Sequence, residues 1–126
     1  MSKLIVFLVY IILSGCVFDS GSKDLVGEYN VRWIDTGCTM TIARGPAGLM
    51  EGQIYHLGWN EDFIIAKRHP ECKQDETDYF IIDIKENQIE QYSQTRGVYG
   101  PLTESQFKII FTELGIQKNL VFNYEP

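Results

Sequence analysis

The chain has 126 residues, of which 11 are basic and 17 are acidic, so its formal net charge at neutral pH is −6. This length provides one small domain with a single hydrophobic core. Because phosphate-rich surfaces repel an acidic chain, the charge argues against nucleic acid as a partner and against the bare membrane surface as a docking site.

The first 16 residues have the order of a secretory signal peptide. Lys3 supplies a positive charge, and the ten residues from Leu4 to Leu13 form an unbroken apolar run. That run is too short to span a membrane, which takes about 20 helical residues. The end of the run, Leu13-Ser14-Gly15-Cys16, resembles the lipobox of bacterial lipoproteins. The resemblance implies cleavage before Cys16 and a lipid on its thiol.

We therefore expect an exported lipoprotein that is anchored to a membrane of the bacterial cell envelope through Cys16. Several acyl chains, at about 0.8 kcal/mol per buried CH₂, make such an anchor stable. Val17 is not the aspartate that retains lipoproteins in the inner membrane, so an outer-membrane location is favoured in a cell that has one. Behind the signal peptide (1–16) we predict a flexible tether over 17–26 and one globular domain over 27–126.

Apolar periodicity predicts a series of strands in this domain. Alternation of apolar and polar residues indicates strands near 29–33, 40–42 and 55–59. Residues 63–66 and 79–84 are apolar with little alternation, which predicts two central strands buried on both faces. Weaker strands are expected at 89–92 and 120–124.

One helix is predicted near the end of the chain. Thr103 and Gln106 can form a capping box, and Gly115 stands where a left-handed cap is expected. Between them four apolar residues recur at helical spacing: Phe107, Ile110, Phe111 and Leu114. Short connections favour antiparallel pairing, so the predicted class is α+β, an antiparallel five- or six-stranded, mostly meandering sheet with one C-terminal helix packed on it.

Several segments of the domain carry a second resemblance. They are Gly58-Trp59-Asn60-Glu61, Phe63-Ile64-Ile65-Ala66-Lys67, Tyr79-Phe80-Ile81-Ile82-Asp83, Gly100-Pro101-Leu102-Thr103 and Phe107. Over residues 54–116 the chain resembles an uncharacterised family of small bacterial envelope proteins. The resemblance implies the envelope setting and supports the predicted fold, and it implies no activity.

The string Asp35-Thr36-Gly37 resembles the half-site of retroviral-type aspartic proteases. Such enzymes pair two carboxylates, so a chain of this size would have to dimerise. The second motif of those proteases is represented here only by Glu113-Leu114-Gly115, which the helix end already explains. Asp and Gly also suit a turn without catalysis. A dimeric aspartic-type hydrolase is therefore the alternative function, and the favoured interpretation is that the protein is not an enzyme.

Two histidines and one acidic loop are candidate metal ligands. With Asn60-Glu61 as the turn, His56 and His69 lie about 13 Å apart. With Glu61-Asp62 they become diagonal neighbours, and neither register supplies a third zinc ligand. The acidic residues of the loop 71–78 lack the spacing of a calcium site. We expect no cofactor and no metal.

Four aromatic residues near strand ends or loops are the candidate partner-binding residues: Trp33, Trp59, Tyr92 and Tyr99. Exposed aromatic side chains with polar rims are typical of protein interfaces. The sequence therefore predicts a membrane-tethered, non-catalytic module that binds a protein or another envelope component.

Cys38 and Cys72 are the two thiols that remain once Cys16 carries a lipid. Export to an oxidising compartment favours a disulfide between them. A simple meander instead separates them by roughly 24 Å, whereas a disulfide tolerates at most about 7 Å between Cα atoms. The meander thus predicts two free or buried thiols, and a Cys38–Cys72 crosslink would mean that the sheet is folded over or reordered.

Overall fold

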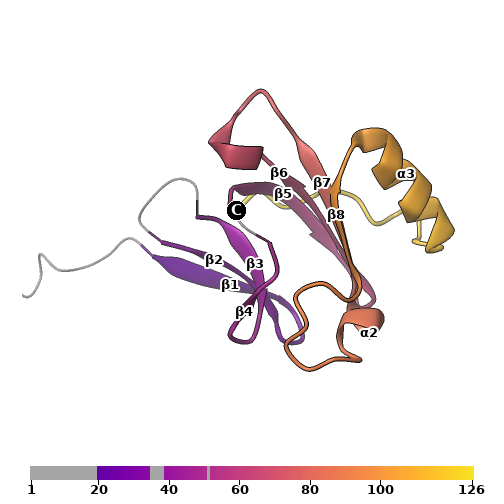
Figure 1. Cartoon of the computed structure of the whole chain (residues 1–126), viewed down its shortest axis with the longest axis horizontal. Coiled ribbons are helices and arrows are strands. Elements are labelled where there is room, and N and C mark those ends of the chain that lie inside the picture. Colours follow the sequence, from indigo (N-terminus) through magenta and orange to yellow (C-terminus); the bar gives the residue numbers. More distant parts are fainter. Residues whose placement is uncertain (1–19, 35–38, 51) are drawn as a thin grey trace, which may run out of the picture.

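The computed structural model describes residues 20–34, 39–50 and 52–126. Its strands form two four-stranded antiparallel sheets (Figure 1). Sheet A consists of β1 (Gly21–Val26), β2 (Tyr29–Trp33), β3 (Thr41–Arg44) and β4 (Ala47–Gly48) in that order. Sheet B consists of β5 (Ile54–Trp59), β6 (Phe63–Arg68), β7 (Asp78–Asp83) and β8 (Val98–Leu102) in that order. The helices are η1 (Pro70–Cys72), α2 (Ile84–Asn87) and α3 (Glu104–Glu113).

Sheet B is the middle of three layers, with sheet A on one face and α3 on the other (Figure 1). Neighbouring residues of its central strands point to different cores. Ile64 of β6 and Ile82 of β7 are buried against sheet A, whereas Ile65 and Ile81 are buried against α3. This confirms the prediction that the two uninterrupted apolar segments are central strands covered on both sides.

The predicted single sheet is wrong, although the antiparallel pairing and the C-terminal helix are confirmed. The chain leaves sheet A after β4, and Leu49 and Met50 are buried in the core between the sheets. β5 then starts sheet B, with only the Ile54 N–H bonded back to the Met40 carbonyl at 3.1 Å. Apolar periodicity reveals which face of a strand is buried and does not identify the strand beside it, so it could not show this break.

Two local predictions are also corrected. Residues 21–26, expected in the tether, form β1, whose Ser22, Lys23 and Asp24 side chains are exposed. Backbone pairing with β2 at the edge of sheet A holds this strand, so it needs no apolar alternation. Residues 89–92, which were expected to form a strand, belong instead to the loop 88–97. This loop leads from α2, which Asp83 caps, to β8.

Helix α3 has the predicted ends. The Thr103 hydroxyl accepts a hydrogen bond from the Gln106 N–H, and the Gln106 side chain accepts one from the Thr103 N–H. At the other end Gly115 has φ of 68°, and the Ile116 N–H donates to the Phe111 carbonyl at 3.2 Å. This is the hydrogen bond of a Schellman motif, so the chain reverses where the sequence predicted it.

Candidate functional site

An apolar groove lies between α3 and the C-terminal segment that follows it. It encloses about 310 Å³. Six apolar residues line it: Ile65, Phe107, Phe111, Leu120, Val121 and Phe122. Lys108 and Thr112 of α3 supply the polar part of the lining. The Val121 side chain is 53% exposed, so apolar surface is open to solvent along this groove.

The course of the C-terminal segment creates the groove. After the reversal at Gly115, Ile116 and Leu120 pack into the core beneath α3. The segment then crosses β5, where the Leu57 N–H donates to the Tyr124 carbonyl at 2.8 Å. Gly58 permits this crossing, because a Cβ atom there would overlap the Val121 carbonyl group. The segment therefore runs close along sheet B beside α3, and the groove lies between the two.

Packed aromatic rings form the floor of the groove. The ring centroid of Phe107 lies 5.6 Å from that of Phe111 and 5.6 Å from that of Phe122. Tyr79 of β7 lies 5.0 Å from Phe107 on the sheet side. Aromatic pairs at these separations stabilise one another, so the apolar surface is largely preformed. Chemically it can bury an apolar group.

The rim of the groove carries little fixed charge. The Lys108 ammonium lies 3.3 Å from a Glu104 carboxylate oxygen one helical turn away, and both side chains are mostly exposed. Exposed pairs of this kind contribute little to stability. Lys67 lies at the sheet end of the site, with its ammonium 4.7 Å from the centre of the Phe122 ring. Both lysines can approach a polar group on a bound partner.

A second feature, the buried polar cluster around Asn87, has a structural role. Asn87 is fully buried, and its side-chain oxygen accepts a 2.6 Å hydrogen bond from the Tyr29 hydroxyl. Its amide group donates to the carbonyls of Ser93 and Arg96, while Arg44 donates to the Asn87 carbonyl at 2.9 Å. Burial raises the pKa of Tyr29, and the nearby Arg44 charge opposes that shift. The hydrogen-bonding groups of the Asn87 side chain are used within the protein, where they fasten the loop 88–97 to sheet A.

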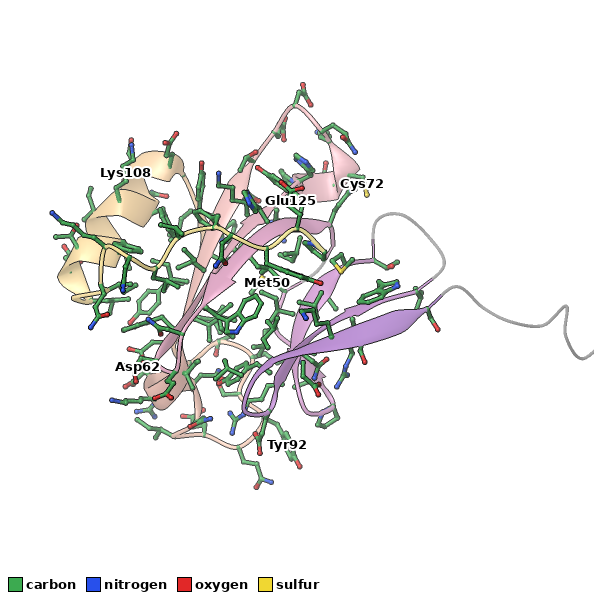
Figure 2. The ribbon with its side chains drawn as sticks, turned by 180° about the vertical axis from the view of Figure 1, so that it is seen from behind. Met50, Asp62, Cys72, Tyr92, Lys108 and Glu125 are labelled. Carbon is green, nitrogen blue, oxygen red and sulfur yellow. The ribbon has the colours of Figure 1, made fainter. Side chains whose placement is uncertain are left out.

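The four predicted partner-binding aromatics are not brought together. Trp33 and Trp59 pack against the core between the sheets, whereas Tyr99 packs against the core beneath α3. Tyr92, in the loop 88–97, is 56% exposed and lies far from Lys108 of α3 (Figure 2). The four residues therefore do not form one surface.

The two histidines follow the second of the predicted registers. His56 faces Lys67 in the β5–β6 pairing. Tyr55 lies in a bulge there, and its ring stacks on that of His69 at 3.9 Å. Nδ1 of His69 lies 2.9 Å from the Glu76 carbonyl. Over residues 20–34, 39–50 and 52–126, no three His, Cys, Asp or Glu side chains are placed to hold a metal ion.

Three of the predicted features lie outside the described residues: Cys16, the Asp35-Thr36-Gly37 turn and Cys38. Cys72 is disulfide-bonded, so the prediction of a free thiol there is wrong. That prediction assumed one flat sheet, whereas here the Ile54 N–H bonds to Met40 and the His69 N–H bonds to the Gln53 carbonyl at 3.0 Å. These bonds bring the start of β3 close to the end of β6.

No helix in the part of the chain that the structure describes has the length and apolarity of a membrane span.

The groove itself could not be read from the sequence, although its residues fall within predicted elements. Phe107 and Phe111 were assigned to the apolar stripe that packs α3 on the sheet, and Leu120 to Tyr124 to a strand. The segment 120–124 instead makes a single bridge, between Leu57 and Tyr124. The available signal was the run Leu120-Val121-Phe122, since an alternating edge strand would not place three apolar residues in succession.

The family described as "protein of unknown function (DUF3997)" matches residues 41–125 of the chain. The match runs from β3 through all of sheet B and α3, so it contains every residue of the groove. It agrees with the predicted likeness to an uncharacterised family over residues 54–116. No match was found among the curated proteins or among the solved structures.

Proposed function

The chain belongs to this family of proteins of unknown function, and we propose that it is a membrane-tethered lipoprotein that binds another envelope protein through the groove beside α3. The groove is the observation that carries this proposal. It combines a floor of packed aromatic rings, an exposed apolar wall at Val121 and a polar rim at Lys108. Protein interfaces are built in this way, with an apolar centre inside a polar border.

The size of the groove favours an apolar side chain of a protein as its occupant. A volume of about 310 Å³ lies at the lower end of the range for small-molecule pockets, roughly 300–1,000 Å³. The groove is also open along the exposed Val121 side chain. An open site of this size suits one or two anchoring side chains of a partner, which is how a few residues supply most of the affinity at protein interfaces.

The position of the groove favours a partner that approaches from the aqueous phase. The proposed tether enters the domain at β1, the outer strand of sheet A. Helix α3 lies on the other side of sheet B (Figure 1), and the groove lies beside this helix. A domain held to the membrane through β1 can therefore present the groove away from its point of attachment.

The pKa shifts of the described residues arise away from the groove. Burial raises the pKa of Tyr29, which lies within the core between the sheets, and of Tyr79, which packs half-buried against the core beneath α3. Ion pairs with glutamates raise the pKa of Lys73 and of Arg96 at the surface. Each of these shifts has a local structural cause, and none of the four residues lines the groove.

Site-directed crosslinking in cells tests the proposal. A photoreactive amino acid at Val121 should capture a specific envelope protein, whereas the same group at Ile89, a similarly exposed position in the loop 88–97, should not. Thr112→Arg should abolish the Val121 product, because the larger charged side chain fills the polar wall of the groove. Identical products from positions 121 and 89, or a Val121 product that persists in the Thr112→Arg protein, would count against the groove.

A further inference from the structure

We propose that the Trp33 end of sheet A rests on the surface of the bilayer that carries the lipid of Cys16, with Trp33 and Ile34 at the level of the headgroups. The inference rests on the lipid anchor of the proposed function. It adds a second contact with the same membrane and thereby an orientation for the domain.

Only a few residues separate the anchor at Cys16 from sheet A. β1 begins at Gly21, five residues after Cys16. At no more than about 3.5 Å per residue, the backbone of Gly21 stays within roughly 18 Å of that of Cys16. Gly21 stands directly opposite Trp33 in the β1–β2 pairing. Anchoring at Cys16 therefore keeps the Trp33 end of sheet A next to the lipid headgroups.

The Trp33 end of sheet A carries side chains that suit the membrane–water interface. The indole ring of Trp33 lies across Gly21, because a Cβ atom on Gly21 would overlap the ring. The next residue, Ile34, is apolar and 63% exposed. Tryptophan is enriched where proteins meet the membrane–water interface, since its ring is apolar and its N–H is polar. A half-buried tryptophan beside an exposed isoleucine is suited to that depth.

The chain as a whole is acidic, so the charges near the Trp33 end decide which lipids this end can contact. The exposed charges of β1, Lys23 and Asp24, are of opposite sign. The Glu104 and Glu113 charges belong to α3, on the other face of sheet B (Figure 1), whereas the acidic loop of residues 70–78 follows the end of β6 that lies close to the start of β3 and so offers no attraction for anionic lipid. Contact at the Trp33 end thus depends on apolar insertion and requires no anionic lipid. We expect it on neutral bilayers.

The chain provides its own control, since it contains two tryptophans. Trp59 lies at the end of β5 next to the turn whose Asp62 carbonyl accepts a hydrogen bond from the Ile84 N–H of α2. Asn87, at the end of α2, bonds to Tyr29, which is the residue of β2 most distant from Trp33. Trp59 therefore lies toward the Tyr29 end of β2, whereas Trp33 is the last residue of that strand.

Fluorescence quenching by lipid tests the inference. The full-length protein is purified in its acylated form from cells and reconstituted into phosphatidylcholine vesicles whose acyl chains are brominated near the headgroup. In the Trp59→Phe protein, the emission of Trp33 should be quenched and shifted to shorter wavelength. In the Trp33→Phe protein, the emission of Trp59 should be unchanged. Equal quenching of both, no quenching of Trp33, or quenching that requires anionic lipid would overturn the proposal.

A second pair of substitutions leaves Trp33 in place and changes an exposed isoleucine instead. Ile34→Ser should reduce the quenching of Trp33 measured in the Trp59→Phe background. Ile109→Ser removes a similarly exposed isoleucine from α3 and should leave the quenching unchanged. Equal effects of the two substitutions would contradict a contact at the Trp33 end.

Mass spectrometry of the same preparations distinguishes a failure of the lipid anchor from a failure of the docked orientation. A protein without an acyl group on Cys16 would refute both the anchor and the docked orientation. A protein that is acylated and retained on vesicles, but whose Trp33 emission brominated lipid does not quench, would refute the orientation alone.

Discussion

The Val121 carbonyl group lies directly over Gly58, in the space that a Cβ atom on that residue would fill. This relationship joins the C-terminal segment to sheet B and thereby forms one wall of the groove. It also makes a glycine in the middle of a strand a requirement of the site, whereas strands otherwise disfavour glycine.

Gly58→Ala should therefore destabilise the protein and displace the segment around Val121. Overpacking of this kind costs about 1–3 kcal/mol, which urea denaturation can measure. Gly48→Ala is the matched control, because Gly48 is also in a strand and a Cβ atom there would meet nothing within 4 Å. If the two substitutions cost the same, the close approach at Gly58 does not constrain the fold. Val121 crosslinking should fail only in the Gly58→Ala protein.

Tyr29→Phe tests the buried polar cluster. The substitution removes the hydroxyl that donates to the Asn87 side chain at 2.6 Å, in a site from which water is excluded. We expect the free energy of unfolding to fall by about 1–3 kcal/mol, because a buried acceptor loses its shorter hydrogen bond. Tyr55→Phe is the control: its hydroxyl bonds to Thr77 at 2.9 Å in an exposed position, so its removal should cost less.

Alkaline pH should destabilise the protein through the same hydroxyl. Burial raises the pKa of Tyr29 above its unfolded value of about 10. Between the unfolded and the folded pKa, the unfolded chain releases a proton that the folded chain retains, so stability is complete below about pH 10 and falls as pH rises through the folded pKa. The fall should be smaller in the Tyr29→Phe protein. Some should persist there, because burial also raises the pKa of Tyr79. Equal pH profiles for the two proteins would contradict this origin.

Local features of the sequence predicted local features of the fold well. Thr103, Gln106 and Gly115 set both ends of α3, because capping depends only on residues within a few positions of one another. Continuous apolarity likewise placed β6 and β7 at the centre of a sheet. In each case the sequence pattern and the structural constraint act over the same few residues.

The division into two sheets and the groove depend on contacts between distant parts of the chain. Sequence patterns at Leu49 and Met50 indicate burial and do not specify which sheet follows. The groove arises where residues near 121 cross residue 58 beside α3, and no short pattern records that crossing. The anchor is the reverse case: its prediction rests wholly on the local signal at Cys16, which lies outside the described residues.

Cys16→Ser should abolish membrane retention by removing the thiol that accepts the lipid. Metabolic labelling with a fatty-acid analogue should mark the wild-type protein and not the variant, and the variant should appear in the soluble fraction. Cys72→Ser is the matched control, since it also removes a cysteine and should remain labelled. Equal labelling of the wild-type and Cys16→Ser proteins would refute the anchor.

Cys72 is disulfide-bonded, and the sequence allows its partner to be predicted. The chain has three cysteines, and Cys16 is expected to carry the lipid, so we expect the disulfide to join Cys72 to Cys38. The hydrogen bond from Ile54 to Met40 and that from His69 to Gln53 support this pairing, because together they bring the start of β3 near the segment that precedes Cys72. The fold that separates the two sheets is thus also the one in which this disulfide can form.

Closing a loop of about 34 residues stabilises by roughly 3.5–4 kcal/mol in the loop-entropy model. Cys38→Ser and Cys72→Ser should therefore lower the free energy of unfolding by the same amount, and the double variant by no more, because each change breaks the same bond. Mass spectrometry of the alkylated, unreduced protein should show a peptide pair that contains Cys38 and Cys72. A Cys16–Cys72 pair would instead contradict both this prediction and the lipid anchor, since a thiol in a disulfide cannot accept a lipid.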